Sequence, residues 1–359
     1  MPSPLVSHVG FLSPGSYPDD DPAGGLERTL QLFEFGESLG YDSAWVRQRH
    51  LEPGVSAAAV FLAAASQRTR HIQLGTAVIP MGYESPYRLA EDLATVDVLS
   101  RGRLNVGLSA GTPPHAELLA PLVFDGEWRG HDFSHARVQR LADNLRGHYL
   151  GAPDSLIDIP GGRIRPRLQP YAKGLVERLW YGGGSLRSAE WAGRSGFNLL
   201  MGNVTTGEGT DDFFEAQARQ LETYRKASAR PRVALGRVIV PYDSADRATR
   251  QRYADYAASR QARTLAPNGP RRTLYAADLV GPSEQILERL AADPVLAGIS
   301  EFRLELPYAF DQHDYEQILT DFIRHIAPEL GWGTGSADFS ATGSSVAISA
   351  SSSARGPHL

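Results

Sequence analysis

The chain has 359 residues and a formal net charge of −5, with 42% apolar and 21% charged residues. This composition is ordinary for a globular protein, and the negative charge argues against nucleic acid or an anionic membrane as the main partner. No apolar run is long enough for a membrane span, the N-terminal residues do not resemble a signal peptide, and cysteine is absent, so a cytoplasmic protein is expected.

Strand-like and helix-like stretches alternate along the chain. Short apolar runs predict strands at 6–13, 43–48, 71–80, 103–110, 177–184, 197–202, 231–241 and 299–307. Amphipathic patterns predict helices at 26–39, 57–69, 87–99, 134–149, 185–195, 211–227, 244–264, 282–292 and 315–326, with Ser56 as the cap of the second. Strands that alternate with helices in this way predict parallel α/β structure.

The alternation is interrupted twice. Residues 112–174 contain Pro- and Gly-rich loops around one predicted helix, and 244–264 is an inserted or extended helix. The expected fold is therefore an α/β protein, a (β/α)8 TIM barrel with insertions after strands 4 and 7. We expect residues 1–332 to form this barrel and residues 333–359, which are rich in Ser, Gly and Ala, to be a disordered tail.

A glycine run marks the end of the fifth predicted strand. Gly182, Gly183 and Gly184 are followed directly by Ser185 and a predicted helix, and Ser188 lies one turn further on. Bare backbone and the free N–H groups of a helix start suit a phosphate, and the two hydroxyls add donors. A plain glycine turn with Ser185 as the helix cap is the alternative.

Basic residues end the second predicted strand, in the sequence Arg47-Gln48-Arg49-His50. Strand alternation places Arg47 and Arg49 on one side and Gln48 and His50 on the other. At a barrel mouth such groups bind anions or stabilise a developing negative charge. Solvated surface charge is the alternative.

A third pattern, Gly107-Leu108-Ser109-Ala110-Gly111, matches the nucleophile elbow of α/β hydrolases. That elbow needs a helix directly after the serine, whereas 112–114 reads Thr-Pro-Pro, which delays one. A serine hydrolase that uses Ser109 is therefore kept as an alternative. The ten histidines show no metal-ligand spacing, so no metal site is expected.

Two longer stretches resemble one known family. Residues 74–111 read LGTAVIPMGYESPYRLAEDLATVDVLSRGRLNVGLSAG, and a second stretch reads GGGSLRSAEWAGRSGFNLL. Together with LVGPSEQILERL and ISEFRLELPYAF nearer the C-terminus, they resemble the bacterial luciferase-like, flavin-dependent monooxygenases. The similarity runs with gaps from about Val6 to Leu330.

The resemblance implies a (β/α)8 barrel enzyme that uses reduced FMN and O2. A separate NAD(P)H-dependent flavin reductase would supply FMNH2 in a two-component system, and a flavin C4a-hydroperoxide would oxidise a small organic substrate. Some members use F420 instead, and a homodimer is possible. The resemblance also implies a cis peptide at Ala77–Val78 and a set of cofactor-binding residues: Gly75, Thr76, Ala77 and Val78 under the ring, and Gly183, Gly184, Ser185 and Ser188 at the phosphate.

Two departures from the family pattern concern residues expected near the flavin. Luciferase has two adjacent histidines where this chain has Arg49 and His50, and an arginine cannot act as a base at pH 7. Where luciferase has a reactive cysteine and a phosphate-binding arginine, this chain has Ser109 and Ala110. The candidate catalytic residues are therefore His50, Arg49 and Ser109. The expected function is an FMNH2-dependent monooxygenase, with an F420-dependent oxidoreductase, a serine hydrolase and a non-catalytic flavin-binding barrel as alternatives.

Overall fold

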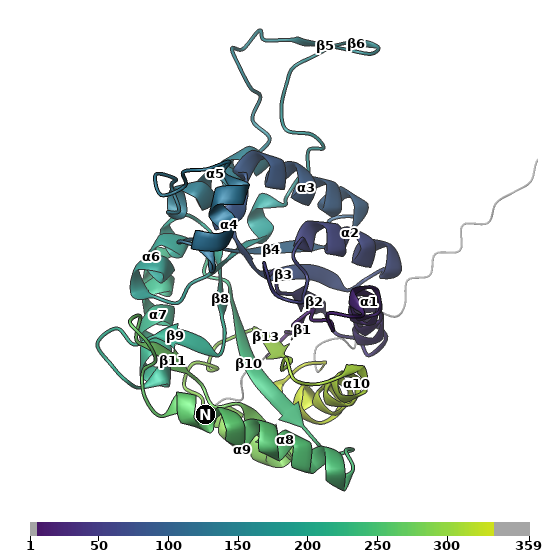
Figure 1. Ribbon diagram of the computed structural model, residues 1–359, viewed down its shortest axis with the longest axis vertical. Helices are drawn as coiled ribbons and strands as arrows, with labels where there is room; N and C mark the ends of the chain where they lie inside the picture. The colour runs from purple at the N-terminus through teal and green to yellow at the C-terminus, as the bar shows by residue number, and fades with distance from the viewer. Residues whose placement is uncertain (1–5, 334–359) are drawn as a thin grey trace, which may run out of the picture.

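A closed ring of eight parallel strands forms the centre of the computed structural model, which describes residues 6–333 (Figure 1). Neighbours pair in the order β1–β2–β3–β4–β7–β8–β10–β13, and β13 pairs with β1 to close the ring. The fold is thus the predicted (β/α)8 barrel. Its strands are His8–Ser13 (β1), Ser43–Val46 (β2), Gln73–Pro80 (β3), Leu104–Ser109 (β4), Leu179–Gly182 (β7), Asn198–Met201 (β8), Val233–Pro241 (β10) and Glu301–Glu305 (β13).

Helices surround this ring, and the first begins with residues that favour a helix N-terminus. Asp21 caps the first helix by accepting from Gly24 N at 2.9 Å, and Pro22 follows at its first position. The helices that follow barrel strands are Pro22–Ser38 (α1), Ala58–Arg68 (α2), Pro86–Leu99 (α3), Leu186–Arg194 (α6), Phe213–Ala227 (α7), Ser283–Ala291 (α9) and Gln312–Asp321 (α10). Short helical turns occur at Met81–Tyr83 and Pro328–Leu330, and α10 continues through Phe322–Ile326.

The predicted cap of α2 is wrong. Its N-cap is Ala57, and no side chain caps it locally. The Ala58 N–H instead donates to the Oε1 atom of Gln48, 3.1 Å away. A residue of the β2 loop therefore does what Ser56 was expected to do.

The insertion after β4 contains more structure than the sequence predicted. It holds two helices, Ala116–Val123 (α4) and His135–Leu145 (α5), the hairpin of Ile157–Ile159 (β5) and Gly162–Ile164 (β6), and a turn at Val176–Arg178. The hairpin projects away from the barrel beyond α3 and α5 (Figure 1). The short helix α4 was missed because Pro121 lies inside it and two prolines precede it.

The second insertion follows β10. It contains Arg247–Arg260 (α8), a turn at Gln261–Thr264, and the strands Thr273–Tyr275 (β11) and Leu279–Gly281 (β12). The antiparallel partner of β11 is Val204–Thr206 (β9), in the loop after β8. The β9–β11 ribbon lies beside the start of α6, since Thr206 N on β9 donates to the Gly184 carbonyl at 2.9 Å. The predicted tail lies outside the described residues except for Gly333.

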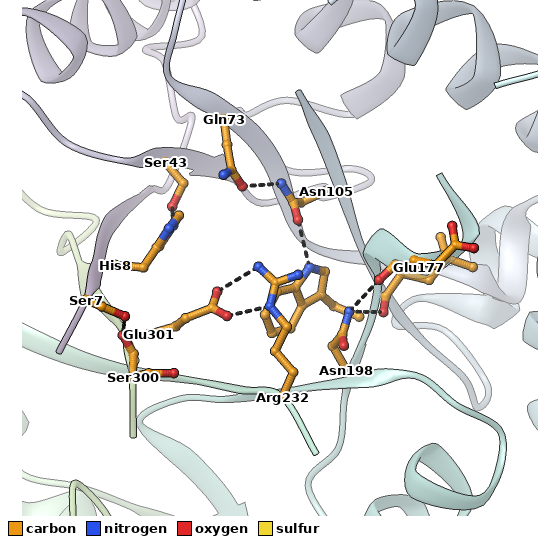
Figure 2. A network of polar contacts seen from close by, with 12 residues as sticks. Ser7, His8, Ser43, Gln73, Asn105, Glu177, Asn198, Arg232, Ser300 and Glu301 are labelled. Atoms are coloured by element: carbon orange, nitrogen blue, oxygen red, sulfur yellow. Dashed lines mark hydrogen bonds and ion pairs between the residues drawn. The ribbon is translucent and has the colours of Figure 1, made fainter. Parts of the chain in front are cut away.

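Polar side chains fill the N-terminal end of the barrel (Figure 2). Asn105 donates to Gln73 at 2.8 Å and accepts from the Trp180 indole at 3.0 Å. Arg232 pairs with Glu301 on the neighbouring strand, with Nη2 and Oε2 3.2 Å apart. His8 also belongs to this layer, 2.8 Å from the Ser43 hydroxyl, and burial lowers its pKa. These partners satisfy groups that would otherwise be costly to bury.

Above this layer the barrel interior is aromatic. The rings of Trp45 and Trp180 meet edge to face with centroids 5.9 Å apart. Gly75 is required beside them, because a Cβ on this residue would lie 2.2 Å from the Trp45 ring. Leu12, Ala77, Leu200 and Ala234 complete the cluster, which supports the mouth of the barrel from below.

Replacing Gly75 with alanine should therefore lower the free energy of unfolding by about 1–3 kcal/mol, the usual cost of overpacking a core. Urea denaturation would measure it. Gly130→Ala is the matched control, since a Cβ there would meet nothing within 4 Å. Equal costs for the two variants would contradict this account of the barrel interior.

Candidate active site at the mouth of the barrel

The end of β3 forms an apolar ledge at the C-terminal mouth. Between Thr76 and Ile79 the pairing of β3 with β4 shifts register, so β3 bulges at Ala77 and Val78. The peptide bond between these two residues is cis, as predicted. Ala77 is packed on the aromatic cluster, and Val78 is half-buried above it.

Glycines on the neighbouring strands leave room for this ledge. A Cβ on Gly182 would lie 2.9 Å from Val78 Cγ1, and a Cβ on Gly107 would lie 3.2 Å from the same atom. Next to Val78, β4 and β7 therefore present the bare backbone of Gly107 and Gly182. An apolar ledge beside bare backbone suits a flat ring system.

Gly75 and Thr76, the other two residues predicted under a flavin ring, lie deeper. Gly75 faces Trp45 in the barrel interior. Thr76 is fully buried; its hydroxyl donates to the Gly107 carbonyl at 2.9 Å and accepts from the Gly107 N–H at 3.0 Å. Both residues hold the ledge in place, and only Ala77 and Val78 reach the mouth.

The alternation predicted after β2 is present. Arg47 and Arg49 both meet Tyr308 of the loop after β13: the Arg47 guanidinium lies 5.5 Å from the ring centroid, and Arg49 Nη2 lies 3.5 Å from the hydroxyl. Arg47 also donates to Glu305 at 3.0 Å. Arg47 and Arg49 thus connect the end of β2 to β13 and the loop after it, across β1.

Glu305 has a second basic neighbour. Arg303 is completely buried against the Trp45 ring, and its Nη2 atom lies 3.8 Å from Glu305. Burial lowers the pKa of Arg303 to about 10, so it stays protonated at pH 7. Two guanidinium groups share one carboxylate, which leaves a net positive charge inside the mouth.

Gln48 and His50 point the other way, as the alternation predicts. Gln48 Oε1 accepts from Ala58 N, so Gln48 Nε2 is the donor that meets Glu84 Oε1 at 2.7 Å and His50 Nε2 at 3.3 Å. Burial lowers the pKa of His50, so the ring is neutral at pH 7. Because Nε2 accepts from Gln48, the ring proton lies on Nδ1.

Ser109 lies at the end of β4 and is half-buried. Among residues 6–333 no hydrogen bond joins its hydroxyl to a histidine or a carboxylate. The next helix begins at Ala116, so the strand–turn–helix elbow is absent. The site therefore lacks the geometry that the hydrolase alternative requires.

The predicted phosphate-binding residues lie together at the start of α6. Ser185 is the N-cap and forms a capping box with Ser188: Ser185 Oγ accepts from Ser188 N at 3.2 Å, and Ser188 Oγ accepts from Ser185 N at 3.1 Å. The two hydroxyls are 2.9 Å apart. Gly183 and Gly184 lead into this turn, and the Gly184 carbonyl accepts from Thr206 N at 2.9 Å.

Sequence reasoning missed Glu208, which also lies here. Its Oε2 atom accepts from the Leu186 N–H, the first of α6, at 2.6 Å. The residue belongs to the turn after β9, and no local pattern placed that turn beside α6. Tyr308 and Glu305 were missed for the same reason, since they come from the end of β13.

A cavity of about 640 Å³ lies beside the mouth, at the ends of β1 and β13. Ser13, Tyr17, Tyr308 and Phe310 are among its lining residues. Tyr308 is also the residue that Arg47 and Arg49 contact. The cavity is of the size that small-molecule sites have. In residues 6–333 no cluster of three or more His, Asp or Glu side chains suits a metal ion, and no helix is long and apolar enough to cross a membrane.

Comparison with known proteins identifies the family. A family model described as luciferase-like monooxygenase matches residues 7–301. The chain belongs to this family. Within the luciferase-like monooxygenases it is 36% identical over 111 residues to 4-hydroxyprotoasukamycin monooxygenase of Streptomyces nodosus subsp. asukaensis, a match that covers 30% of each chain. The chain thus spans less than a third of the length of this curated relative.

Two further comparisons cover most of the chain. An F420-dependent glucose-6-phosphate dehydrogenase of Kribbella flavida is 24% identical over 319 residues, which cover 82% of this chain and 91% of that protein. The oxygenating constituent of 3,6-diketocamphane monooxygenase of Pseudomonas putida, solved with FMN, superimposes with a TM-score of 0.68 at 15% identity and covers 90% of this chain and 98% of its own. The second likeness shows the shared fold. These named proteins are oxidoreductases, the class of enzyme that the sequence predicts.

Proposed function

We propose that this luciferase-like protein is a monooxygenase that uses O2 and reduced FMN, supplied by a separate NAD(P)H-dependent reductase, to oxidise a small organic substrate. The observation that carries the proposal is the apolar ledge of Ala77 and Val78, beside which β4 and β7 carry Gly107 and Gly182. No hydrogen bond joins Ser109 to a histidine or a carboxylate among the described residues, so cofactor chemistry explains the site better than a serine nucleophile.

The residues at the mouth differ in how well they fit FMN. The ledge is apolar, and Gly107 and Gly182 of the adjacent strands have no side chains beside Val78, which fits an isoalloxazine ring. At the start of α6, Ser185 and Ser188 offer two hydroxyls and Gly183–Gly184 a bare backbone, which fits a phosphate. One helix N–H already has an acceptor, however, in Glu208.

Bound reduced flavin would supply the electrons and the oxygen activation. The protein would supply positive charge, a hydrogen-bond donor and space for the substrate. Arg47 and Arg303, which both pair with Glu305, give the mouth a positive charge that would stabilise negative charge forming there. His50 offers its Nδ1–H as a donor, and the cavity beside Tyr308 offers space for a substrate.

The role of His50 predicts a pH profile. Turnover should fall as the pH drops through the pKa of His50, which burial places below 6.5. Protonation of His50 Nε2 would set two N–H donors against each other, because Gln48 Nε2 already donates to that atom. Folding should weaken in the same direction, since the unfolded chain takes up the proton first. His50→Ala should lower turnover about three- to tenfold, the value of one neutral hydrogen bond, and should remove this acid limb. An unchanged profile in His50→Ala would assign the limb to another group.

Cofactor use tests the proposed function directly. The purified protein would be titrated with FMN under reducing conditions and with F420H2, then supplied with O2, an NAD(P)H–flavin reductase, and panels of ketones, amines and sulfur compounds. We expect binding of reduced FMN and an oxygenated product that incorporates label from ¹⁸O2. Oxidation of F420H2 without oxygen incorporation would instead favour the F420-dependent alternative, which the long match to the Kribbella flavida enzyme supports.

A further inference from the structure

The start of α6 already holds an anion that belongs to the chain. Glu208 Oε2 accepts from the Leu186 N–H at 2.6 Å, the shortest of the hydrogen bonds described for this turn. A carboxylate at a helix N-terminus is stabilised by the unpaired N–H groups and by the helix dipole. Glu208 therefore lies where a phosphate would be stabilised for the same reasons.

The backbone holds Glu208 in this position. Its own N–H donates to Thr206 O at 3.0 Å, and Thr206 N donates to the carbonyl of Gly184, just before the N-cap of α6. Gly207 in turn pairs with Arg272, which precedes β11: its N–H donates to Arg272 O at 2.9 Å. The turn that carries Glu208 is thus bound to the β9–β11 ribbon and to the start of α6, where Gly183, Gly184, Ser185 and Ser188 form what we call the cradle.

Among residues 6–333, the two hydroxyl groups of the cradle form hydrogen bonds only within the cradle. The hydroxyls of Ser185 and Ser188 bond mutually, both belong to the capping box, and Ser188 Oγ also donates to the Ser185 carbonyl at 2.9 Å. Arg187, on the first turn of α6, is exposed and makes no hydrogen bond or ion pair among the described residues. Hydroxyls and a cation are therefore available to an incoming anion, and the negative charge that opposes it is Glu208.

We infer that Glu208 weakens the preference of this protein for FMN over riboflavin, by competing with the phosphate group for the N-terminus of α6. The inference rests on the proposed function. A dianionic phosphate must displace the carboxylate from the Leu186 N–H and then stay close to its charge. Riboflavin, which lacks the phosphate, has no such conflict. Glu208 thus narrows the difference in affinity between FMN and riboflavin.

Inorganic phosphate tests the competition without any flavin. Glu208→Gln keeps the size of the side chain and removes its charge, and Glu208→Ala serves as a second variant. In thermal denaturation at constant ionic strength, phosphate should raise the Tm of both variants more than that of the wild type. Glu190→Gln, which removes a half-exposed carboxylate paired with Arg194 further along α6, is the control and should behave like the wild type. Equal phosphate shifts in all four proteins would overturn the inference.

Flavin titration then measures the preference itself. Glu208→Gln should bind FMN about tenfold more tightly than the wild type, the effect of one charge-assisted hydrogen bond, while its affinity for riboflavin changes less than about twofold. An equal gain for both flavins, or none for FMN, would overturn the inference and leave the proposed function intact. A phosphate effect without binding of either flavin would support the role of Glu208 as a competitor for anions and would count against the proposed function.

Discussion

Replacing Arg237 with methionine should lower the free energy of unfolding by about 3–5 kcal/mol, the cost of breaking a buried ion pair. Arg237 points outward from β10, and its side chain is 2% exposed, next to Asp293 at 3%. Its Nε donates to Asp293 Oδ2 at 2.8 Å, and its Nη2 donates to Gln217 Oε1 on α7, also at 2.8 Å. The substitution would leave the Asp293 carboxylate charged and buried with no cation beside it.

Two further variants isolate the effect of burial. Arg219→Met removes an ion pair with Glu215 on α7, in which both side chains are nearly half exposed, so it should cost less than about 1 kcal/mol. Arg237→Met combined with Asp293→Leu should recover much of the loss, because an apolar pair of similar volume is close to neutral. Urea denaturation measures all three. A cost for Arg237→Met no larger than that for Arg219→Met would show that the buried pair is not a main support of β10.

The barrel could be predicted from the sequence because each strand has a local signal. The run at 231–241 is almost continuously apolar, as a strand covered on both faces must be, and the structure has β10 at Val233–Pro241. The same reasoning failed at α4, where Pro121 disguises a helix, and at the cap of α2, where the acceptor is Gln48 from another loop. Local patterns thus identify elements, whereas contacts between distant loops remain hidden from them.

In the candidate site, too, local patterns predict some residues, whereas contacts between distant segments place the others. The run from Gly182 to Ser185 and the pair Arg47 and Arg49 are placed by strand ends and alternation, which are local properties. Glu208 lies 22 residues beyond Leu186, in a turn held by the pairing of β9 with β11 and by the bond from Thr206 N to Gly184 O, and Tyr308 reaches Arg47 because β13 closes the ring beside β1. No local pattern in the sequence marks either contact. This explains why the glycines and serines at the start of α6 could be predicted and the carboxylate of Glu208 beside them could not.

Replacing either Ser185 or Ser188 with alanine should weaken FMN binding about ten- to hundredfold, since each hydroxyl would donate a hydrogen bond to a charged phosphate. In the free protein the two hydroxyls bond to each other and cap α6, so each variant should also lose about 1 kcal/mol of stability. Binding is therefore to be compared where circular dichroism shows every variant folded.

Riboflavin separates loss of the phosphate contact from loss of the cap. A hydroxyl that binds phosphate contributes nothing to riboflavin, so the riboflavin affinity of both variants should stay within about twofold of the wild type. Ser195→Ala, at the other end of α6, is the matched control and should alter neither affinity. In the Glu208→Gln background the loss of FMN affinity should grow, because the phosphate would then be seated more firmly against both serines. Equal losses for FMN and riboflavin would mean that the serines only cap the helix and that the phosphate binds elsewhere.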